Sequence, residues 1–390
     1  MELKNLKNHV RTLATLSETD APVISCYLFL ERGHIKEPNL FEERIRDIKS
    51  ILTGQARHDF EKAMDFIRKY LAEELKSEAK GTAIFARARK EPFYLPLQFR
   101  VPLPNWIVAD RAPNIYHLME LKDTYHRYVV ILSTKESARI LEINLGSVTK
   151  ELWKNRPELR QRVGREWTKE HYQNHRKERG RKFIKEKIKT LEHLMSAGGH
   201  THLILAGHPT NIGLIRRELP RHLADKLIDM IPASSKTPIS NIVESSIANF
   251  IVAERKKTQM VEKKFFWQIQ TGGLAVAGTG PTYLALKRGQ VDTLVLAKSY
   301  SLGQAWACAT CDLIDPERDK PATCPVCGSI DLKNFDIREE MVRLAEQHGC
   351  STEVVNKSED LMQLGGVGCL LRYRLLDDYA YESNRRRTSL

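Results

Sequence analysis

The chain has 390 residues, enough for roughly two or three domains, and its 62 Lys and Arg against 49 Asp and Glu give a formal net charge of +13. This charge favours a polyanionic partner, with nucleic acid as the first candidate and an anionic membrane as the second. No apolar run approaches the roughly 20 residues that span a bilayer, and the first residues are charged where a signal peptide needs an apolar stretch. We therefore expect a cytoplasmic, multi-domain α/β protein with no membrane partner.

The first part of the chain, residues 1–148, is predicted to form an α/β domain. Pro22–Leu30 is an apolar strand, and Phe41–Leu71 has the pattern of two helices with a break near Gly54. Five further strands are expected at Gly81–Ala86, Tyr94–Phe99, Trp106–Ala109, Tyr128–Leu132 and Ala138–Asn144.

A basic segment opens the predicted middle domain, residues 149–260. Between Lys154 and Lys189, only five glutamates oppose the many Lys and Arg residues, and aromatic rings stand among them. Planar rings beside guanidinium groups suit stacking on unpaired bases and neutralisation of phosphates. The predicted RNA contacts are Lys154, Arg156, Arg160, Arg162, Arg165, Trp167, Lys169, His171, Tyr172, Arg176, Lys177, Arg179 and Arg181.

The alternative for this segment is an ordinary solvated helix. From Lys169 onward the spacing is helical and offers i,i+4 pairs such as Glu178 with Lys182. Later in the middle domain we expect a long helix over Lys182–Met195, a buried strand at His202–Ala206 and an amphipathic helix over Ile239–Arg255.

The predicted third domain, residues 261–390, has a further α/β alternation. A helix over Thr282–Arg288 turns at Gly289 into the strand Val291–Ala297. Asp336 and Glu339 have the spacing of a capping box, which predicts that a helix starts there and ends at Gly349. A strand at Thr352–Val355 is expected to follow.

Cysteines inside the third domain have the spacing of a metal site. Two CxxC pairs form a C-x2-C-x12-C-x2-C array, with Cys308, Cys311, Cys324 and Cys327 as the ligands. Such pairs surround one Zn²⁺ in a closed tetrahedral site that leaves no position for a catalytic water. The segment between them is polar and cannot bury a core, so we expect structural Zn²⁺ to hold the 306–329 knuckle together.

Two alternatives remain for these cysteines, a pair of disulfides or four unpaired thiols. The other cysteines, Cys26, Cys350 and Cys369, stand in apolar runs and are predicted to be small core residues.

Several stretches resemble the class I release factors of eukaryotes and archaea. Residues 358–374, with Gly365-Gly366-Val367-Gly368, resemble the closing motif of that family, as do residues 283–296. A zinc knuckle between these two stretches occurs in archaeal members, and Leu203–Gly207 is similar to the middle-domain strand. The resemblance runs from about residue 20 to 375 and implies three α/β domains of the architecture that release factors share with Pelota.

The sequence departs from release factors at their functional motifs. It contains no Gly-Gly-Gln, the motif whose glutamine helps to position water at the peptidyl-transferase centre, and Gly303-Gln304 lies in the wrong domain. The stop-codon motif Tyr-x-Cys-x-x-x-Phe falls on Ile107, Ala109 and Pro113. Asp47-Ile48-Lys49-Ser50 resembles the Asn-Ile-Lys-Ser motif but lies in a predicted continuous helix.

In lacking both motif types, the chain resembles the bacterial members of this superfamily. Among these members, ribosome hibernation factors of the Balon type are the best defined. This resemblance implies a non-enzymatic factor in the A site of the 70S ribosome, near 16S and 23S rRNA. It also implies delivery by elongation factor Tu or a related GTPase, and no small-molecule substrate.

Two other classes of function remain. A rescue factor, or a peptidyl-tRNA hydrolase or release factor with a replaced catalytic loop, would orient water with Gln161, Glu166 or His171. A dinucleotide-binding protein is suggested by the glycines around Gly273–Gly280 and Gly365–Gly368, but neither stretch has the G-x-G-x-x-G spacing.

Overall fold

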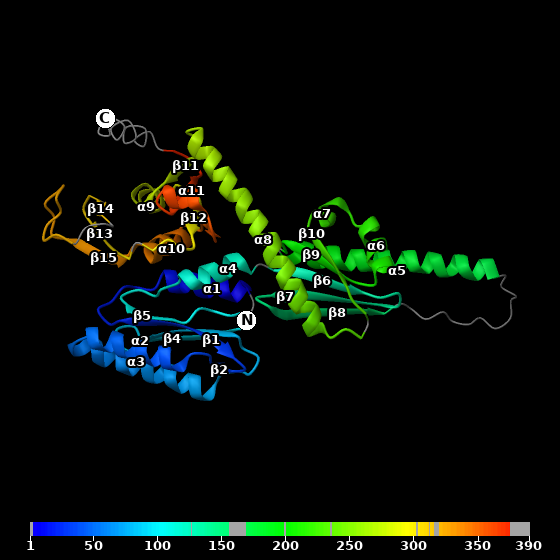
Figure 1. Ribbon diagram of the computed structural model, residues 1–390, viewed down its shortest axis with the longest axis horizontal. Coiled ribbons are helices and arrows are strands. Elements are labelled where there is room, and N and C mark those ends of the chain that lie inside the picture. Colours follow the sequence, from blue (N-terminus) through cyan, green and yellow to red (C-terminus); the bar gives the residue numbers. More distant parts are fainter. Residues whose placement is uncertain are drawn as a thin grey trace. The chain divides into compact units, whose positions relative to one another are not determined.

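The computed structural model describes residues 3–125, 127–155, 169–198, 200–234, 236–301, 303–311, 313–315 and 320–374 (Figure 1). Contacts between Cα atoms divide the chain into two compact units. The first, which we call the middle unit, contains Phe99–Val101 and Thr124–Glu254. The second, which we call the split unit, contains Asn5–Gln98, Pro102–Asp123 and the chain from Arg255 onward. None of the helices in the described ranges is long and apolar enough to cross a membrane.

The amino-terminal part of the split unit is a β-sheet covered by two long helices. The strand order is β2-β1-β3-β4, with β5 also paired to β1. The elements are α1 (Leu3–Ala14), β1 (Val23–Glu31), β2 (His34–Ile35), α2 (Pro38–Ile51), α3 (Gly54–Glu73), β3 (Gly81–Arg87), β4 (Phe93–Phe99), β5 (Trp106–Asp110) and α4 (Tyr116–Thr124).

Alternate side chains of β1 and the inward faces of the two helices build the core of this part. Ile24 and Leu28 on β1 pack with Phe60 and Ile67 on α3, all at most 1 % exposed. The predicted helix break is confirmed, because Gly54 has φ of +55° and begins α3 after α2 has ended. Phe60 and Ile67 are seven residues apart and lie on the same buried face of α3. This spacing of apolar residues is the helical periodicity that the sequence shows in this region.

The middle unit is a five-stranded sheet with helices on both faces. Its strand order is β10-β9-β6-β7-β8, in which β10, β9 and β6 are parallel and β6, β7 and β8 are antiparallel. The elements are β6 (Tyr128–Ser133), β7 (Ser137–Asn144), β8 (Ser147–Asn155), α5 (Lys169–Gly198), β9 (His202–Gly207), α6 (Pro209–Glu218), α7 (Arg221–Ala224), β10 (Leu227–Pro232) and α8 (Ile239–Gln270), which continues into the split unit.

Successive side chains of β6 point to opposite faces of this sheet, and each face packs against a different helix. Val129 and Ile131 face the cluster that contains Leu191 of α5, whereas Val130 faces the cluster that contains Phe250 of α8. Because β6 and β7 pair with β8 and β9 in one sheet, the domain boundary predicted at residues 148–149 falls inside strand β8. The edge of the middle unit lies near residue 124 instead.

The carboxy-terminal part of the split unit holds a second sheet, of order β11-β17-β12-β16, and a small antiparallel sheet, of order β14-β13-β15. The remaining elements are β11 (Ala275–Ala277), α9 (Thr279–Lys287), β12 (Val291–Ala297), β13 (Gln304–Cys308), β14 (Ile314–Asp315), β15 (Leu332–Asp336), α10 (Ile337–Gln347), β16 (Ser351–Val355), α11 (Glu359–Gln363) and β17 (Val367–Leu371).

The Gly-Gly-Val-Gly stretch has a packing role. A Cβ atom at Gly368 would lie 2.4 Å from the Phe265 ring and 2.9 Å from the carbonyl oxygen of Val276. Gly365 and Gly366 have φ of +95° and +73° and form the turn before β17. Gly368 therefore allows Phe265 and β11 to pack closely against the last strand.

Candidate functional site

The four cysteines of the CxxC pairs meet at one point, as their spacing predicted. Their sulfur atoms all lie within 4.8 Å of one another. Sγ of Cys308 is 3.4 Å from Sγ of Cys327, and Sγ of Cys311 is 3.6 Å from Sγ of Cys324. Four sulfurs around one ion at about 2.3 Å would be separated by about 3.8 Å, whereas a disulfide needs about 2.05 Å. The cluster can therefore ligate one metal ion, and all four thiols are free.

Short turns hold each CxxC pair in place. The first pair follows β13, where the amide of Cys308 donates to the carbonyl of Leu313 at 2.8 Å. In the second pair, Gly328 has φ of +73°, and its amide donates to the carbonyl of Cys324 at 2.9 Å. Cys308 and Cys324 are buried against Trp306 and Leu332, while the other two cysteines are exposed. The apolar contact is small, so ligation would add much of the stability of this segment.

Backbone amides favour thiolates at the first cysteine of each pair. Burial would raise the pKa of Cys308, but the amides of Cys311 and Thr310 outweigh it and hold this pKa at about 6. The amides of Cys327 and Val326 likewise lower the pKa of Cys324. Metal ligation requires deprotonated sulfur, so the turns prepare these two thiols for it.

The three other cysteines lie in the core, which confirms their predicted role. Cys26, Cys350 and Cys369 are at most 6 % exposed. Burial raises the pKa of each of these thiols, which makes them unreactive compared with the cluster.

The predicted RNA contacts divide into three groups in the structure. Arg156, Arg160, Arg162, Arg165 and Trp167 lie outside the described residues. The backbone of Lys154 is in β8, and the backbones of Lys169, His171, Tyr172, Arg176 and Lys177 are in α5.

Only two predicted RNA contacts have described side chains. Arg179 is half-buried and Arg181 is exposed on α5. The ion pair expected of a solvated helix, Glu178 with Lys182, is present at 3.7 Å between exposed side chains. Among the described residues, this end of α5 therefore has the features of both interpretations, and RNA contact stays a prediction.

The tetrapeptide Asp47–Ser50 lies in the last turns of α2, as the continuous-helix prediction required. The Lys49 ammonium is paired with Glu61 of α3 at 2.5 Å, and the Ser50 hydroxyl donates to the carbonyl of Asp47. Both side chains thus serve contacts within this helix pair and do not form a separate tip.

Helix α10 joins the two parts of the split unit through Glu339. Asp336 caps α10 by accepting from the amide of Glu339, which confirms half of the predicted capping box. The other half is wrong, because the Glu339 carboxylate turns to α4 and accepts from the amides of Ile115 and Tyr116 at 2.8 and 3.1 Å. A carboxyl oxygen at a helix amino terminus can accept from amides that the helix itself leaves unpaired.

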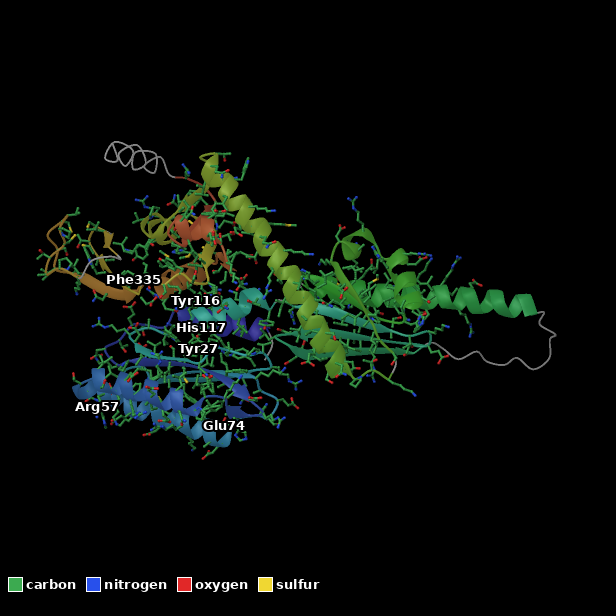
Figure 2. The ribbon with its side chains drawn as sticks, in the orientation of Figure 1. Tyr27, Arg57, Glu74, Tyr116, His117 and Phe335 are labelled. Atoms are coloured by element: carbon green, nitrogen blue, oxygen red, sulfur yellow. The ribbon has the colours of Figure 1, made fainter. Side chains whose placement is uncertain are left out.

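Aromatic rings lie next to one another at the start of α4, where Figure 2 labels Tyr27, Tyr116 and His117. The His117 ring lies edge-on to Tyr27 and Tyr116, with centroids 5.0 and 5.2 Å apart. The Arg338 guanidinium lies 4.1 Å from the centroid of the Tyr116 ring. This cluster could not be recognised in the sequence, since Tyr27 lies about ninety residues before His117 and Arg338 lies more than two hundred residues after it.

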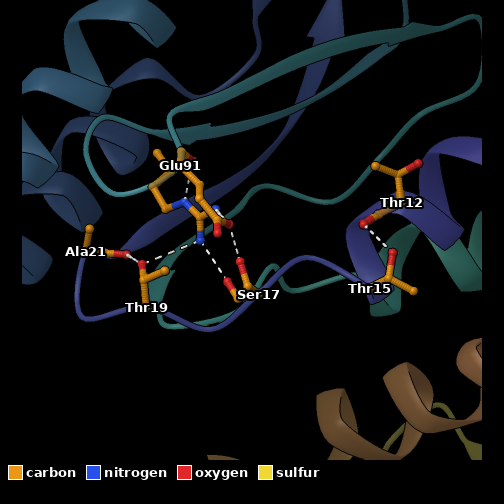
Figure 3. Close-up of polar contacts among 7 residues, drawn as sticks. Thr12, Thr15, Ser17, Thr19, Ala21 and Glu91 are labelled. Atoms are coloured by element: carbon orange, nitrogen blue, oxygen red, sulfur yellow. Dashed lines mark hydrogen bonds and ion pairs between the residues drawn. The ribbon is translucent and has the colours of Figure 1, made fainter.

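A cavity of about 400 Å³ opens beside Glu339. One wall is the segment after α1, which the buried Arg87 holds by donating to the carbonyl of Ser17 at 2.8 Å and to that of Glu91 at 2.9 Å. The Glu91 carboxylate also accepts from the Ser17 hydroxyl, and Thr19 donates to the carbonyl of Ala21 (Figure 3). The cavity is lined by Glu18, Thr19, Asp20, Asp110, Arg111, Ala112, Pro113, Asn114, Lys333, Asn334, Phe335, Asp336, Glu339, Glu340 and Arg343.

Glu339 should make the stability of the split unit depend on pH. Burial raises the pKa of its carboxyl group to about 8 from the ordinary 4.5, although the Arg338 charge opposes the rise, and the side chain is 12 % exposed. Between pH 4.5 and 8 the folded chain keeps a proton that the unfolded chain releases. The free energy of unfolding therefore falls as pH rises through this window.

Glu339→Gln should flatten that fall, because the amide oxygen can still accept from α4 but does not titrate. Urea unfolding followed by circular dichroism at several pH values between 4.5 and 8.5 measures the slope. Glu340→Gln is the matched control, since it breaks the Arg343 ion pair at 2.7 Å but keeps Glu339. A Glu339→Gln slope equal to that of the unsubstituted protein would contradict the assignment.

Comparison with known proteins gives one family match. Residues 113–250, which run from before α4 into α8, match the model of bacterial archaeo-eukaryotic release factor family 10. A peptide chain release factor subunit 1 from Thermococcus onnurineus is 27 % identical over 207 residues, which are 47 % of this chain and 49 % of the relative. One from Pyrococcus abyssi is 25 % identical over 207 residues, which are 47 % and 50 %. The chain thus spans about half the length of these curated relatives.

The chain is also similar to solved structures, at low sequence identity. An archaeal translation termination factor is 16 % identical and has a TM-score of 0.27, with 96 % of this chain and 99 % of that chain covered. Ribosome-bound archaeal Pelota is 14 % identical and has a TM-score of 0.42, with 96 % and 94 % covered.

Proposed function

Because this chain belongs to the bacterial archaeo-eukaryotic release factor superfamily, we propose that it is a ribosome-binding factor that occupies the A site and inhibits translation. The observation that carries the proposal is the family match over residues 113–250 in a chain that has no Gly-Gly-Gln. A factor with the scaffold but without the hydrolytic motif would block the site and leave the peptidyl-tRNA intact. This is the behaviour of a Balon-type hibernation factor.

Charge supports a ribosomal partner. The formal net charge of +13 would give favourable, salt-dependent attraction to ribosomal RNA. The segment from Lys154 to Arg181 would contact 23S rRNA, and the amino-terminal part of the split unit would lie toward 16S rRNA. Delivery by elongation factor Tu or a related GTPase, and a place in the cytoplasm of the cell, are parts of the same proposal.

The four-cysteine cluster would hold a structural Zn²⁺. Four sulfur donors in a tetrahedral arrangement are typical of closed zinc sites, and the sulfur spacing fits such a site. Zinc would supply the cross-link that holds the turns after β13 and before β15, so its role would be mechanical and not catalytic.

Release or rescue is the second candidate, and the name of the curated relatives favours it, since both are release factor subunits. In that case a polar residue of the basic segment, such as Gln161, Glu166 or His171, would position water. We propose instead that the chain is not an enzyme, because Gly-Gly-Gln provides the backbone freedom that a single glutamine among bulkier residues lacks.

Two assays on 70S ribosomes distinguish the candidates. With labelled peptidyl-tRNA in the P site, we expect no peptide release above the rate without factor, whether the A site is empty or holds a stop codon. With the same ribosomes, we expect the protein to lower binding of aminoacyl-tRNA in proportion to its occupancy. Peptide release at a rate close to that of an authentic release factor would favour the second candidate.

A further inference from the structure

We propose that the carboxy-terminal end of α8 and the segment after β17 form a second RNA-binding surface, one that stacks unpaired bases. The inference rests on the proposed ribosomal function and adds a contact in the split unit. We name this surface the α8–β17 platform, and it consists of Lys263, Lys264, Trp267, Leu274, Arg372 and Tyr373.

Hydrogen bonds bring the two segments of the platform together. The amide of Leu371 donates to the carbonyl of Leu274 at 2.9 Å, next to the pairing of β11 with β17. Arg374 donates to the carbonyl of Gly273 at 2.6 Å, and Gln268 accepts from the amide of Leu274 at 2.7 Å. The turn between α8 and β11 is therefore fixed against the end of β17, which holds the backbones of the two segments side by side.

The platform exposes two large aromatic rings that the core does not use. Trp267 is 59 % exposed and Tyr373 is 47 % exposed, with Leu274 at 41 % beside the fixed turn. Phe265, two residues before Trp267, is completely buried against Gly368, so the core contact of this turn of α8 is already made. Tryptophan is highly buried on average, and its exposure on a folded surface is typical of a binding site.

The positive charge of the platform favours RNA as its ligand over an apolar protein partner. Lys263, Lys264 and Arg372 are exposed, and in the described part of the chain their side chains form no salt bridge. The half-buried Glu262 is the acidic neighbour of the lysines on α8. Aromatic rings flanked by uncompensated cations suit a single strand, in which bases stack on the rings and phosphates meet the cations. A single-stranded or loop region of RNA is the ligand that uses both features.

Binding of a labelled oligouridine to the full-length protein tests the proposal without ribosomes. Fluorescence anisotropy should show that Trp267→Ala and Tyr373→Ala each raise Kd by roughly fivefold or more, while Trp267→Phe, which keeps a ring, restores most of the loss. Phe66→Ala is the matched control, since Phe66 is a 52 % exposed ring on α3 of the same unit. All of these proteins also carry Arg160→Ala, Arg162→Ala and Arg165→Ala, so that the basic segment contributes less to oligouridine binding.

The contribution of the charged residues is measured separately, by the salt dependence of oligouridine binding. Lys263→Glu with Lys264→Glu should lower the slope of log Kd against log salt by about 1.4, whereas Lys62→Glu with Lys69→Glu, exposed on α3, should not change it. Crosslinking with 4-thiouridine in the oligonucleotide should label the peptides that contain Trp267 or Tyr373.

Each outcome decides the proposal. Unchanged oligouridine binding in the ring variants, with crosslinks only elsewhere, would overturn it. If those variants bind oligouridine normally but co-sediment less with ribosomes, the platform binds a protein and the RNA assignment is wrong. If ring variants lose oligouridine binding but the unsubstituted protein does not co-sediment with ribosomes, the platform stands and the ribosomal function fails.

Discussion

Cys308→Ser should lower the zinc content of the purified protein from about one ion per chain to well under one. Cys308 is fully buried beside Trp306 and lies 3.4 Å from Cys327, so serine removes a thiolate that the others cannot replace. The segment from Trp306 to Ser329 should then open, because only a small apolar cluster remains to hold it. The two larger sheets of the split unit should stay folded, since their strands lie outside this segment.

Elemental analysis measures the metal, and limited proteolysis locates the opening. We expect new cleavage between residues 309 and 328 in Cys308→Ser, and the same cleavage in unsubstituted protein treated with a chelator. Cys350→Ser is the matched control: Cys350 is also buried, but it contacts the carbonyl of Val291 and lies outside the cluster. Full metal content in Cys308→Ser, or very little in the unsubstituted protein, would show that the cluster is not a zinc site.

The cysteine cluster and most strands could be predicted because their signals are local. A CxxC pair brings two thiols together within one turn, and a buried strand such as Val291–Ala297 is an apolar run between two turns. The fold class, mixed α/β, follows from the alternation of such strands with amphipathic helices. These features depend on residues that are neighbours in the sequence.

Helix α8 shows why element lengths were harder to predict. The amphipathic pattern predicted an end at Arg255, but the helix continues to Gln270. Past Arg255 the exposed face includes Met260 and Trp267, at 71 % and 59 % exposure, so apolar residues no longer mark the buried side. The apolar periodicity is lost in the part of the helix that exposes large apolar side chains, because these side chains do not pack in the core.

Contacts between distant segments were not predicted at all. Glu339 has the spacing of a capping-box residue, but its carboxylate is used by the amino terminus of α4, more than two hundred residues earlier. Strand β8 was missed because Ser147–Asn155 is polar and becomes a strand by pairing with β7. Tertiary pairing decides such cases, and a single sequence contains no record of it.

Replacing Arg160, Arg162 and Arg165 together by alanine should weaken binding to 70S ribosomes on the order of a hundredfold at about 0.1 M salt. If each arginine neutralises one phosphate, the slope of log association constant against log salt should fall by about two to three. Co-sedimentation of labelled protein with ribosomes across a range of salt concentrations measures both quantities. The variant should also lose its ability to exclude aminoacyl-tRNA from the A site.

A loss of net charge alone would also weaken binding, and a second variant separates the two causes. Arg216→Ala, Arg217→Ala and Arg221→Ala remove the same charge from exposed positions of α6 and α7 in the middle unit. We expect this control to lower binding only slightly, because distant charges are screened at such salt concentrations. Lys49→Ala should also have little effect, since Lys49 is already paired with Glu61. If both triple variants lose affinity equally, attraction is general and the 154–181 segment makes no specific contact. If neither loses affinity, the ribosome must be bound through another surface, for which the α8–β17 platform is the first candidate.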